Sequence, residues 1–315
     1  MAKSITNFYP TPIFIGGTGR SGTTIVGDLL NEHPQIRTSL PTEIKFLANP
    51  GGLLDITFGR LENPDNPQKK LSFLNYRTYQ KRRKREKARF DEFFNLIWNK
   101  WWQIDAPPPH GRGLSSGISK EKLESLLKLY KKNYRRNRVY AANQFILNLI
   151  TNQDLAGQEL FWVETTPLNI ANAPRILKIA PNAKFINMVR DPRDVISSLL
   201  TKNWGPNTPL EGIGWIEKRI IQGHTALQAI PSDQQITIRL EDLVINDRLN
   251  TYNKLLKFLG LKDSAEMQIF FDSKITSIAA STGRWKSEIS DPIFDNNFKE
   301  MLRRLQNLGI STYQT

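Results

Sequence analysis

A glycine-rich segment near the N-terminus combines hydroxyl side chains with one cation. Residues 16–24 read Gly-Gly-Thr-Gly-Arg-Ser-Gly-Thr-Thr and stand between an apolar run and a segment with helical spacing. Backbone N–H groups in such a turn, with the positive end of the following helix, form a cradle for an anion. Arg20 places a cation inside the loop. The segment therefore predicts a site for a phosphate or a related anion.

A second motif pairs an arginine with a hydroxyl. Arg190 follows the apolar run 183–189, and Ser198 lies eight residues further on. Asp191 is placed as a helix N-cap, with proline at the first helical position, and Asp194 is interpreted as supporting the helix dipole. Residues 191, 194 and 198 share one face of this helix. An arginine and a hydroxyl that converge at the carboxyl end of a strand suit a phosphate monoester.

Strands that alternate with helices must position these two motifs. Apolar runs predict strands at 12–17, 36–40, 160–163, 183–189 and 235–238, and helical spacing predicts helices at about 21–33, 168–180, 192–203, 209–229 and 242–259. This alternation indicates an α/β protein, a P-loop-like three-layer fold with a central parallel sheet. The first motif departs from the P-loop pattern GxxxxGK[ST], because Thr23 stands where that pattern has its phosphate-binding lysine.

The stretch from about 68 to 150 breaks this alternation. It predicts two basic helices, at about 77–103 and 119–136, separated by Pro107-Pro108-Pro109, and no strand. Residues 69–138 hold 20 Lys and Arg against 6 Asp and Glu, so the whole net charge of +14 lies there. We interpret residues 1–315 as a single domain with this helical, strongly basic insertion, which predicts an anionic partner.

Composition excludes several kinds of site. The chain has no cysteine and three histidines, so we expect no disulfide, no thiolate site and no metal. No apolar run approaches the roughly 20 residues that span a bilayer. The first ten residues lack the apolar stretch of a signal peptide, and we expect a cytoplasmic protein without a transmembrane segment.

Together, and in this order, the two motifs resemble those of the sulfotransferases that use 3′-phosphoadenosine 5′-phosphosulfate (PAPS). The resemblance covers roughly 12–48 and 160–290 and is closest to the bacterial, Golgi and tyrosylprotein branches. It also includes His33-Pro34, 238–243 and 283–286.

The resemblance implies roles for the donor-binding residues. Arg20 would reach the bridging oxygen of the donor, and Arg190 and Ser198 would bind its 3′-phosphate. Trp285 would pack near the adenine. The 5′-phosphate would be held by Ser21, Gly22, Thr23 and Thr24, and further charge would come from Lys202, Arg284 and Lys286.

The resemblance also implies a general base on the loop after the first helix. Glu43 is the candidate; the alternative is an exposed carboxylate paired with Lys45. His33 and His224 are interpreted as structural, and His224 is the next candidate for the base.

One departure from the family concerns a lysine that assists sulfuryl transfer. Relatives often carry Glu-Lys-Thr-Pro where this chain reads Glu-Thr-Thr-Pro at 164–167. Thr165 cannot supply the positive charge of that lysine. Three alternatives stay open. The positive charge comes from another residue, which is Lys45, Arg20 or a residue of the insertion. Otherwise sulfuryl transfer is slow, or the protein has lost its activity.

The expected activity is transfer of a sulfuryl group from PAPS to a hydroxyl acceptor, with release of 3′-phosphoadenosine 5′-phosphate (PAP). The acceptor is expected to be a carbohydrate, a glycoconjugate or a small metabolite. The insertion favours an anionic or sugar-containing acceptor. A kinase is the alternative enzyme, opposed by Thr23 and by the lack of a clear strand ending in Asp. Nucleic-acid binding is the third alternative, through the basic insertion and its tryptophans at 98, 101 and 102, whose helical spacing favours a core position instead.

Overall fold

Two compact units make up the chain. The computed structural model describes residues 9–64, 76–103, 113–153, 157, 159–289 and 291–310, without the side chains of 63, 64, 76–79 and 82. The sheet unit comprises Thr11–Thr38, Phe161–Pro174 and Asn182–Thr315. The helical unit comprises Met1–Pro10, Ser39–Leu160 and Arg175–Pro181. The proline run at 107–109 lies outside the described residues, and the single-domain interpretation stays a prediction.

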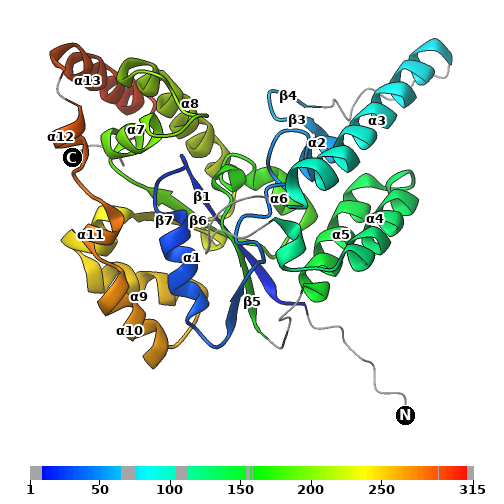
Figure 1. Cartoon of the computed structure of the whole chain (residues 1–315), viewed down its shortest axis with the longest axis horizontal. Coiled ribbons are helices and arrows are strands. Elements are labelled where there is room, and N and C mark those ends of the chain that lie inside the picture. Colours follow the sequence, from blue (N-terminus) through cyan, green and yellow to red (C-terminus); the bar gives the residue numbers. More distant parts are fainter. Residues whose placement is uncertain are drawn as a thin grey trace. The chain divides into compact units, whose positions relative to one another are not determined.

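A five-stranded parallel sheet forms the centre of the sheet unit (Figure 1). Its strands are, in spatial order, β2 (Ile36–Thr38), β5 (Phe161–Glu164), β1 (Thr11–Gly17), β6 (Lys184–Val189) and β7 (Gln235–Arg239). Phe14 of β1 lies opposite Glu164 of β5 on one side and Phe185 of β6 on the other. The central strand β1 therefore delivers the glycine-rich segment to the middle of the sheet's carboxyl edge, where α/β proteins bind ligands.

Helices cover both faces of this sheet. Alternate residues of β1 face opposite sides: Ile13 and Ile15 join the apolar core under α1, α9 and α10, whereas Phe14 stacks on Phe185 with ring centroids 6.0 Å apart. A second apolar core gathers α7, α8 and α13 and includes Val189 of β6. Figure 1 shows the two helix groups on opposite sides of the strands. The predicted three-layer α/β fold is confirmed.

The remaining elements of the sheet unit are helices. They are α1 (Thr23–Asn31), η3 (Pro167–Asn169), α7 (Pro192–Leu200), α8 (Pro209–Leu227), η4 (Ser232–Gln234), η5 (Asp242–Asn246), α9 (Arg248–Leu259), α10 (Ala265–Lys274), α11 (Ser277–Ala280), α12 (Trp285–Glu288) and α13 (Pro292–Asn307). The last four lie in a part of the sequence where no helix is predicted.

Two predicted helices are interrupted. The segment predicted as 168–180 forms the 3-10 turn η3 and then α6 (Ala173–Ile179). At this turn the buried Asn169 donates from its side chain to the Ile15 carbonyl at 3.1 Å, so a tertiary contact overrides helical spacing. The segment predicted as 242–259 forms the π-helical η5, ends at Asp247 with φ −147°, and resumes as α9.

The helical unit has an aromatic core. Its elements are α2 (Leu53–Phe58), β3 (Gly59–Arg60), β4 (Asn63–Pro64), α3 (Tyr76–Leu96), the π-helical η1 (Ile97–Trp101), η2 (Leu114–Ser116), α4 (Lys120–Tyr134) and α5 (Arg138–Asn152). Phe46 packs edge to face against Phe93 and Phe145, and Tyr130 joins them. Helices α3 and α4 confirm the predicted helical insertion, and α5 adds a helix that was not predicted. Within the described ranges, no helix is long and apolar enough to cross a membrane.

Candidate functional site

The turn between β1 and α1 adopts left-handed backbone conformations. Gly19 and Gly22 have φ values of 83° and 94°, which glycine adopts without strain, and Arg20 has φ 56°. The residue that follows β6 supports Arg20, because Arg190 Nη1 donates to the Arg20 carbonyl at 3.1 Å. A non-glycine residue with this φ persists only where its surroundings hold it. Arg20 is exposed, so the turn presents its guanidinium to the solvent side.

The N-terminus of α1 is open to an anion. Its N-cap is Gly22, which has no side chain to accept from the first-turn N–H groups, and no acidic residue lies in the first turn. These N–H groups have no acceptor within the helix, and the helix dipole adds positive potential. Thr23 is buried and Thr24 half-buried at this end. The anion cradle at this turn stays a prediction.

Ser21 lies beneath the turn. Its side chain is fully buried, and its hydroxyl has no hydrogen-bond partner among the described residues. A Cβ added at Gly17 would come within 2.6 Å of this hydroxyl and 2.4 Å of the Met188 carbonyl, so only glycine permits the close packing of the turn on the strands. Buried hydroxyls are rarely left unpartnered, which marks the turn as a candidate functional element.

Arg190 joins three segments at the end of β6. Besides its contact with the turn, its Nη2 donates to the Ser281 carbonyl at 2.7 Å and lies 3.7 Å from the Asp194 carboxylate. Its Nε is buried and has no partner among the described residues. Burial lowers the pKa of Arg190; the carboxylates of Asp194 and Glu241 oppose this shift. Arg190 thus keeps one side-chain N–H without an acceptor at a buried position.

The two sequence motifs meet at Ser198. Arg20 Nε donates to Ser198 Oγ at 2.9 Å, although 178 residues separate them in the chain. The start of α7 sets the position of Ser198, because Asp191 caps this helix by accepting from the Arg193 N–H at 2.9 Å. The structure therefore brings Arg20, Arg190 and Ser198 together at the carboxyl edge of β1 and β6.

Asp194 organises this site in a way that sequence reasoning missed. It was interpreted as a helix-dipole residue, but its carboxylate is buried and accepts from the Gly283 N–H at 2.7 Å and the Trp285 N–H at 3.1 Å. Its spacing of four residues from Arg190 is the one sequence signal for their ion pair. Asp194 thereby holds the turn that carries Arg284 next to α7.

The residues predicted to assist at the 3′-phosphate have different environments. Arg284 pairs with Glu288 at 2.8 Å, and its charge lies near enough to help lower the pKa of Arg190. Trp285 is half-buried, with the Arg193 guanidinium 3.9 Å above its ring, and packs on the core of α7 and α13. Lys202 is half-buried and Lys286 is exposed, and among the described residues no hydrogen bond or ion pair joins either side chain to Arg190 or Ser198.

Glu43, the predicted base, belongs to the helical unit. Its side chain is 30% exposed, and its carboxylate lies 3.9 Å from the Lys45 ammonium, the pairing named as its alternative role. His33 of the sheet unit is engaged at both ring nitrogens: Nδ1 accepts from the Gln35 N–H at 3.1 Å, so Nε2 donates to the Lys262 carbonyl at 3.0 Å. His224 contacts the Gln228 amide at 3.0 Å.

Glu164 anchors the end of β5, and Thr165 packs beside it. The Glu164 carboxylate is buried and accepts from the Thr166 N–H at 3.1 Å and from the Asn169 side chain. Thr165 is also fully buried, and its methyl group lies so close to α1 that a Cβ at Gly27 would come within 2.6 Å of it. A lysine at position 165 would therefore begin inside a packed contact.

The chain is similar in sequence to a known protein family. The sulfotransferase family profile matches residues 12–265. Solved structures similar to the chain include the sulfotransferase domain from the curacin biosynthetic pathway, at 19% identity and TM-score 0.49, with 94% of this chain and 98% of that one covered. A sulfotransferase from Alicyclobacillus acidocaldarius is 15% identical, with TM-score 0.48 and coverage of 98% and 100%. No curated protein matches the chain.

Proposed function

Because the chain belongs to the sulfotransferase family, we propose that it transfers a sulfuryl group from PAPS to a hydroxyl acceptor and releases PAP. The observation that carries the proposal is the hydrogen bond between Arg20 and Ser198, which joins the loop at the start of α1 to the helix after β6. A donor with an anionic group at each end of its ribose needs two neighbouring anion sites. The two joined motifs supply them.

The residues of the sheet unit fit such a donor. Burial is the main cause that lowers the pKa of Arg190, Asp194 and Glu241 oppose it, and the nearby charges of Arg284 and Arg20 lower it further. Three guanidinium groups therefore lie near enough to one another to attract a phosphate. The open end of α1 would receive the 5′-phosphate. We assign the 3′-phosphate to Arg190 and Ser198, as the family resemblance implies.

The proposed reaction is a displacement at sulfur. The acceptor oxygen forms its bond to sulfur while the bond between sulfur and the bridging oxygen of the donor breaks. Glu43 takes the acceptor proton on its carboxylate, a role that follows from the family resemblance. Arg20 and the N–H groups of the turn stabilise the negative charge that develops on the departing phosphate. Thr165 contributes no charge to this step.

Donor choice tests the proposal. We expect calorimetric titration to show PAP binding at least about tenfold more tightly than adenosine 5′-phosphate, because the 3′-phosphate adds a charge-assisted contact. Radiolabelled PAPS incubated with pooled hydroxyl acceptors should yield a labelled product. Preference for ATP over PAP would instead support the kinase alternative and refute the proposal.

A further inference from the structure

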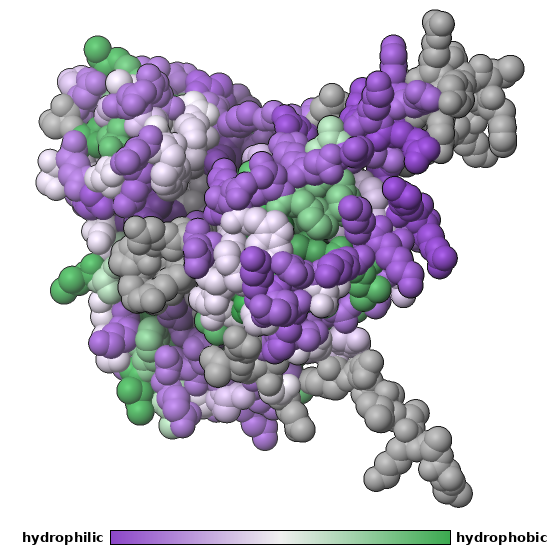
Figure 2. Space-filling view, turned by 45° about the vertical axis from the view of Figure 1, so that its right-hand side comes forward, coloured by the Kyte–Doolittle hydropathy of each residue, from purple (hydrophilic) through white to green (hydrophobic). Residues whose placement is uncertain are grey.

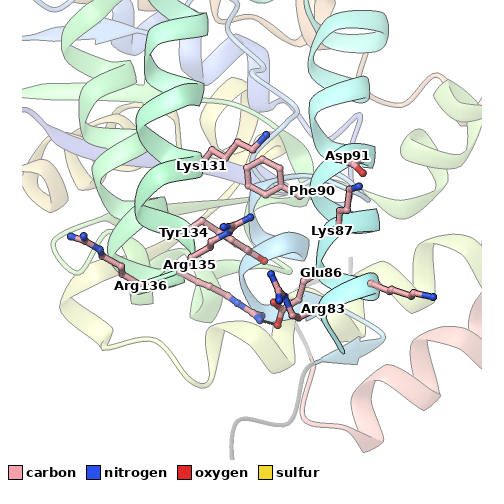
Figure 3. Close-up of a pocket in the computed structure, with 11 residues that line it drawn as sticks. Arg83, Glu86, Lys87, Phe90, Asp91, Lys131, Tyr134, Arg135 and Arg136 are labelled. Atoms are coloured by element: carbon pink, nitrogen blue, oxygen red, sulfur yellow. Dashed lines mark hydrogen bonds and ion pairs between the residues drawn. The ribbon is translucent and has the colours of Figure 1, made fainter. Parts of the chain in front are cut away.

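A hollow of about 780 Å³ lies between α3 and α4 in the helical unit (Figure 3). We call it the basic hollow; one wall comes from residues 83–91 of α3, and the other from 131–138 at the end of α4 and the start of α5. Its volume falls within the range of small-molecule sites, about 300–1,000 Å³. The hollow is therefore large enough for a ligand of several rings.

Cationic side chains dominate its lining. Seven of the lining residues are Lys or Arg and two are carboxylates. Lys84 and Lys87 on α3, Lys131 on α4 and Arg135 just after α4 are all exposed. Figure 2 shows hydrophilic side chains gathered along α3. A bound anion would relieve the repulsion among these like charges.

Aromatic rings beneath the hollow hold two of its cations. The Lys131 ammonium lies 5.9 Å from the centre of the Phe90 ring, and the Arg138 guanidinium lies 5.3 Å from that of Tyr134. Arg138 also pairs with Glu86 of α3. Phe90 and Tyr134 are only 8% and 7% exposed, so they position cations and offer little surface to a ligand.

These features select among anionic ligands. Nucleobases bind by stacking on exposed aromatic faces, which the buried rings of Phe90 and Tyr134 do not provide. The tryptophans that could stack bases do not line the hollow: Trp101 is 2% exposed, and Trp98 and Trp102 are half-buried elsewhere on the helical unit. Duplex DNA is read by an element that protrudes into its groove, the opposite of a hollow.

We propose that the basic hollow binds an acidic oligosaccharide, a chain of sugar rings that carries sulfate or carboxylate groups. Arginine forks pair with such oxyanions through two parallel hydrogen bonds, and lysines add attraction as point charges. Sugar hydroxyls are hydrophilic and need no exposed apolar wall. That the same oligosaccharide is the sulfuryl acceptor rests on the proposed function, because its free hydroxyls would be the receiving groups.

Binding without any donor tests the hollow by itself. A sulfated uronate hexasaccharide is titrated into the full chain in a calorimeter, with a neutral glucose hexasaccharide for comparison. The hollow variant carries Lys84→Glu, Lys87→Glu, Lys131→Glu and Arg135→Glu. The control variant carries Lys81→Glu, Arg85→Glu, Lys128→Glu and Lys132→Glu, which are exposed on the same two helices, outside the hollow, and change the net charge equally.

We expect the hollow variant to bind the acidic hexasaccharide at least about tenfold more weakly, and the control variant to stay within about threefold of the unmodified chain. Glutamine at the same four hollow positions should give the same order of effect, and thermal unfolding midpoints show that each variant is folded. If both variants bound the acidic hexasaccharide equally weakly, the binding would depend on positive charge spread over the surface and not on the hollow, and the proposal would be overturned. So would equal affinity for the neutral hexasaccharide.

Three further probes test the ligand class. Duplex DNA, vesicles containing phosphatidylserine, and poly-glutamate are titrated under the same conditions. Tighter binding of any of them, lost in the hollow variant, would overturn the oligosaccharide assignment. PAP titrations of every variant separate this proposal from the proposed function: PAP binding without hexasaccharide binding refutes the hollow, and the reverse result refutes the donor site.

Discussion

Replacing Asp194 with asparagine separates the charge of this side chain from its shape. The carboxylate accepts from Gly283 and Trp285, so it fixes the turn that carries Arg284, and it lies 3.7 Å from Arg190. Asparagine keeps one oxygen acceptor and places an N–H₂ group where the second oxygen was. One of the two backbone N–H groups then faces a donor. The variant therefore removes one charge-assisted contact from a buried position.

The expected loss follows from that contact. A hydrogen bond to a charged group contributes about 1.5–3 kcal/mol. We expect the free energy of unfolding to fall by about 2 kcal/mol, and the midpoint of thermal unfolding by about 4 °C or more. If Asp194 acted only as a negative charge near the site, its removal would strengthen anion binding. Because it positions Arg190 and the 283–285 turn, we expect PAP to bind about tenfold more weakly, a loss of about 1.4 kcal/mol.

The assay combines calorimetric titration with PAP and thermal unfolding. Asp233→Asn, at an exposed position in η4, makes the same chemical change away from the site and should alter neither quantity. PAP affinity that is unchanged or tighter in Asp194→Asn would refute the positioning role. An unchanged unfolding midpoint would show that the two N–H contacts do not hold the turn.

Three further substitutions test the site. Arg190→Ala should weaken PAP binding by about tenfold or more in calorimetric titration. It should also lower the midpoint of thermal unfolding, because Arg190 donates to the carbonyls of Arg20 and Ser281. Unchanged PAP affinity would show that Arg190 is not part of the donor site. Glu43→Gln should lower kcat by about 10²-fold with little change in PAP affinity; full turnover would move the base elsewhere, first to His224. Thr165→Lys should lower the midpoint of thermal unfolding, since Thr165 is buried against Gly27. If the missing lysine limits sulfuryl transfer, kcat per folded molecule should nevertheless rise. An unchanged kcat would show that the missing lysine does not limit the transfer.

The parts of the site that follow from local rules could be predicted from the sequence. The turn at 16–24 and the helix start at Asp191 depend on glycine, proline and capping residues within a few positions of one another, and both were placed correctly. Hydrophobic periodicity likewise indicated the five strands. These signals are local, so tertiary packing did not alter them.

Contacts across long stretches of chain could not be predicted in this way. Arg20 reaches Ser198 across 178 residues, and Asp194 reaches Gly283 across 89. Residue type alone gave Asp194 a helix-dipole role, because nothing near it in the sequence shows which N–H groups approach its carboxylate. Asn169 interrupts a predicted helix for the same reason, since its partner is the Ile15 carbonyl of another strand.

The left-handed backbone at Arg20 has a consequence for protein engineering. Glycine would occupy φ 56° without the cost of order 1 kcal/mol that a residue with a Cβ incurs there. Arg20→Gly would therefore relax the turn while deleting its cation. The lost hydrogen bond to Ser198 is worth about the same as the strain relieved, so a laboratory selection for heat resistance alone would not retain the loop cation. Libraries aimed at a more durable catalyst should hold position 20 fixed, or screen every survivor for turnover.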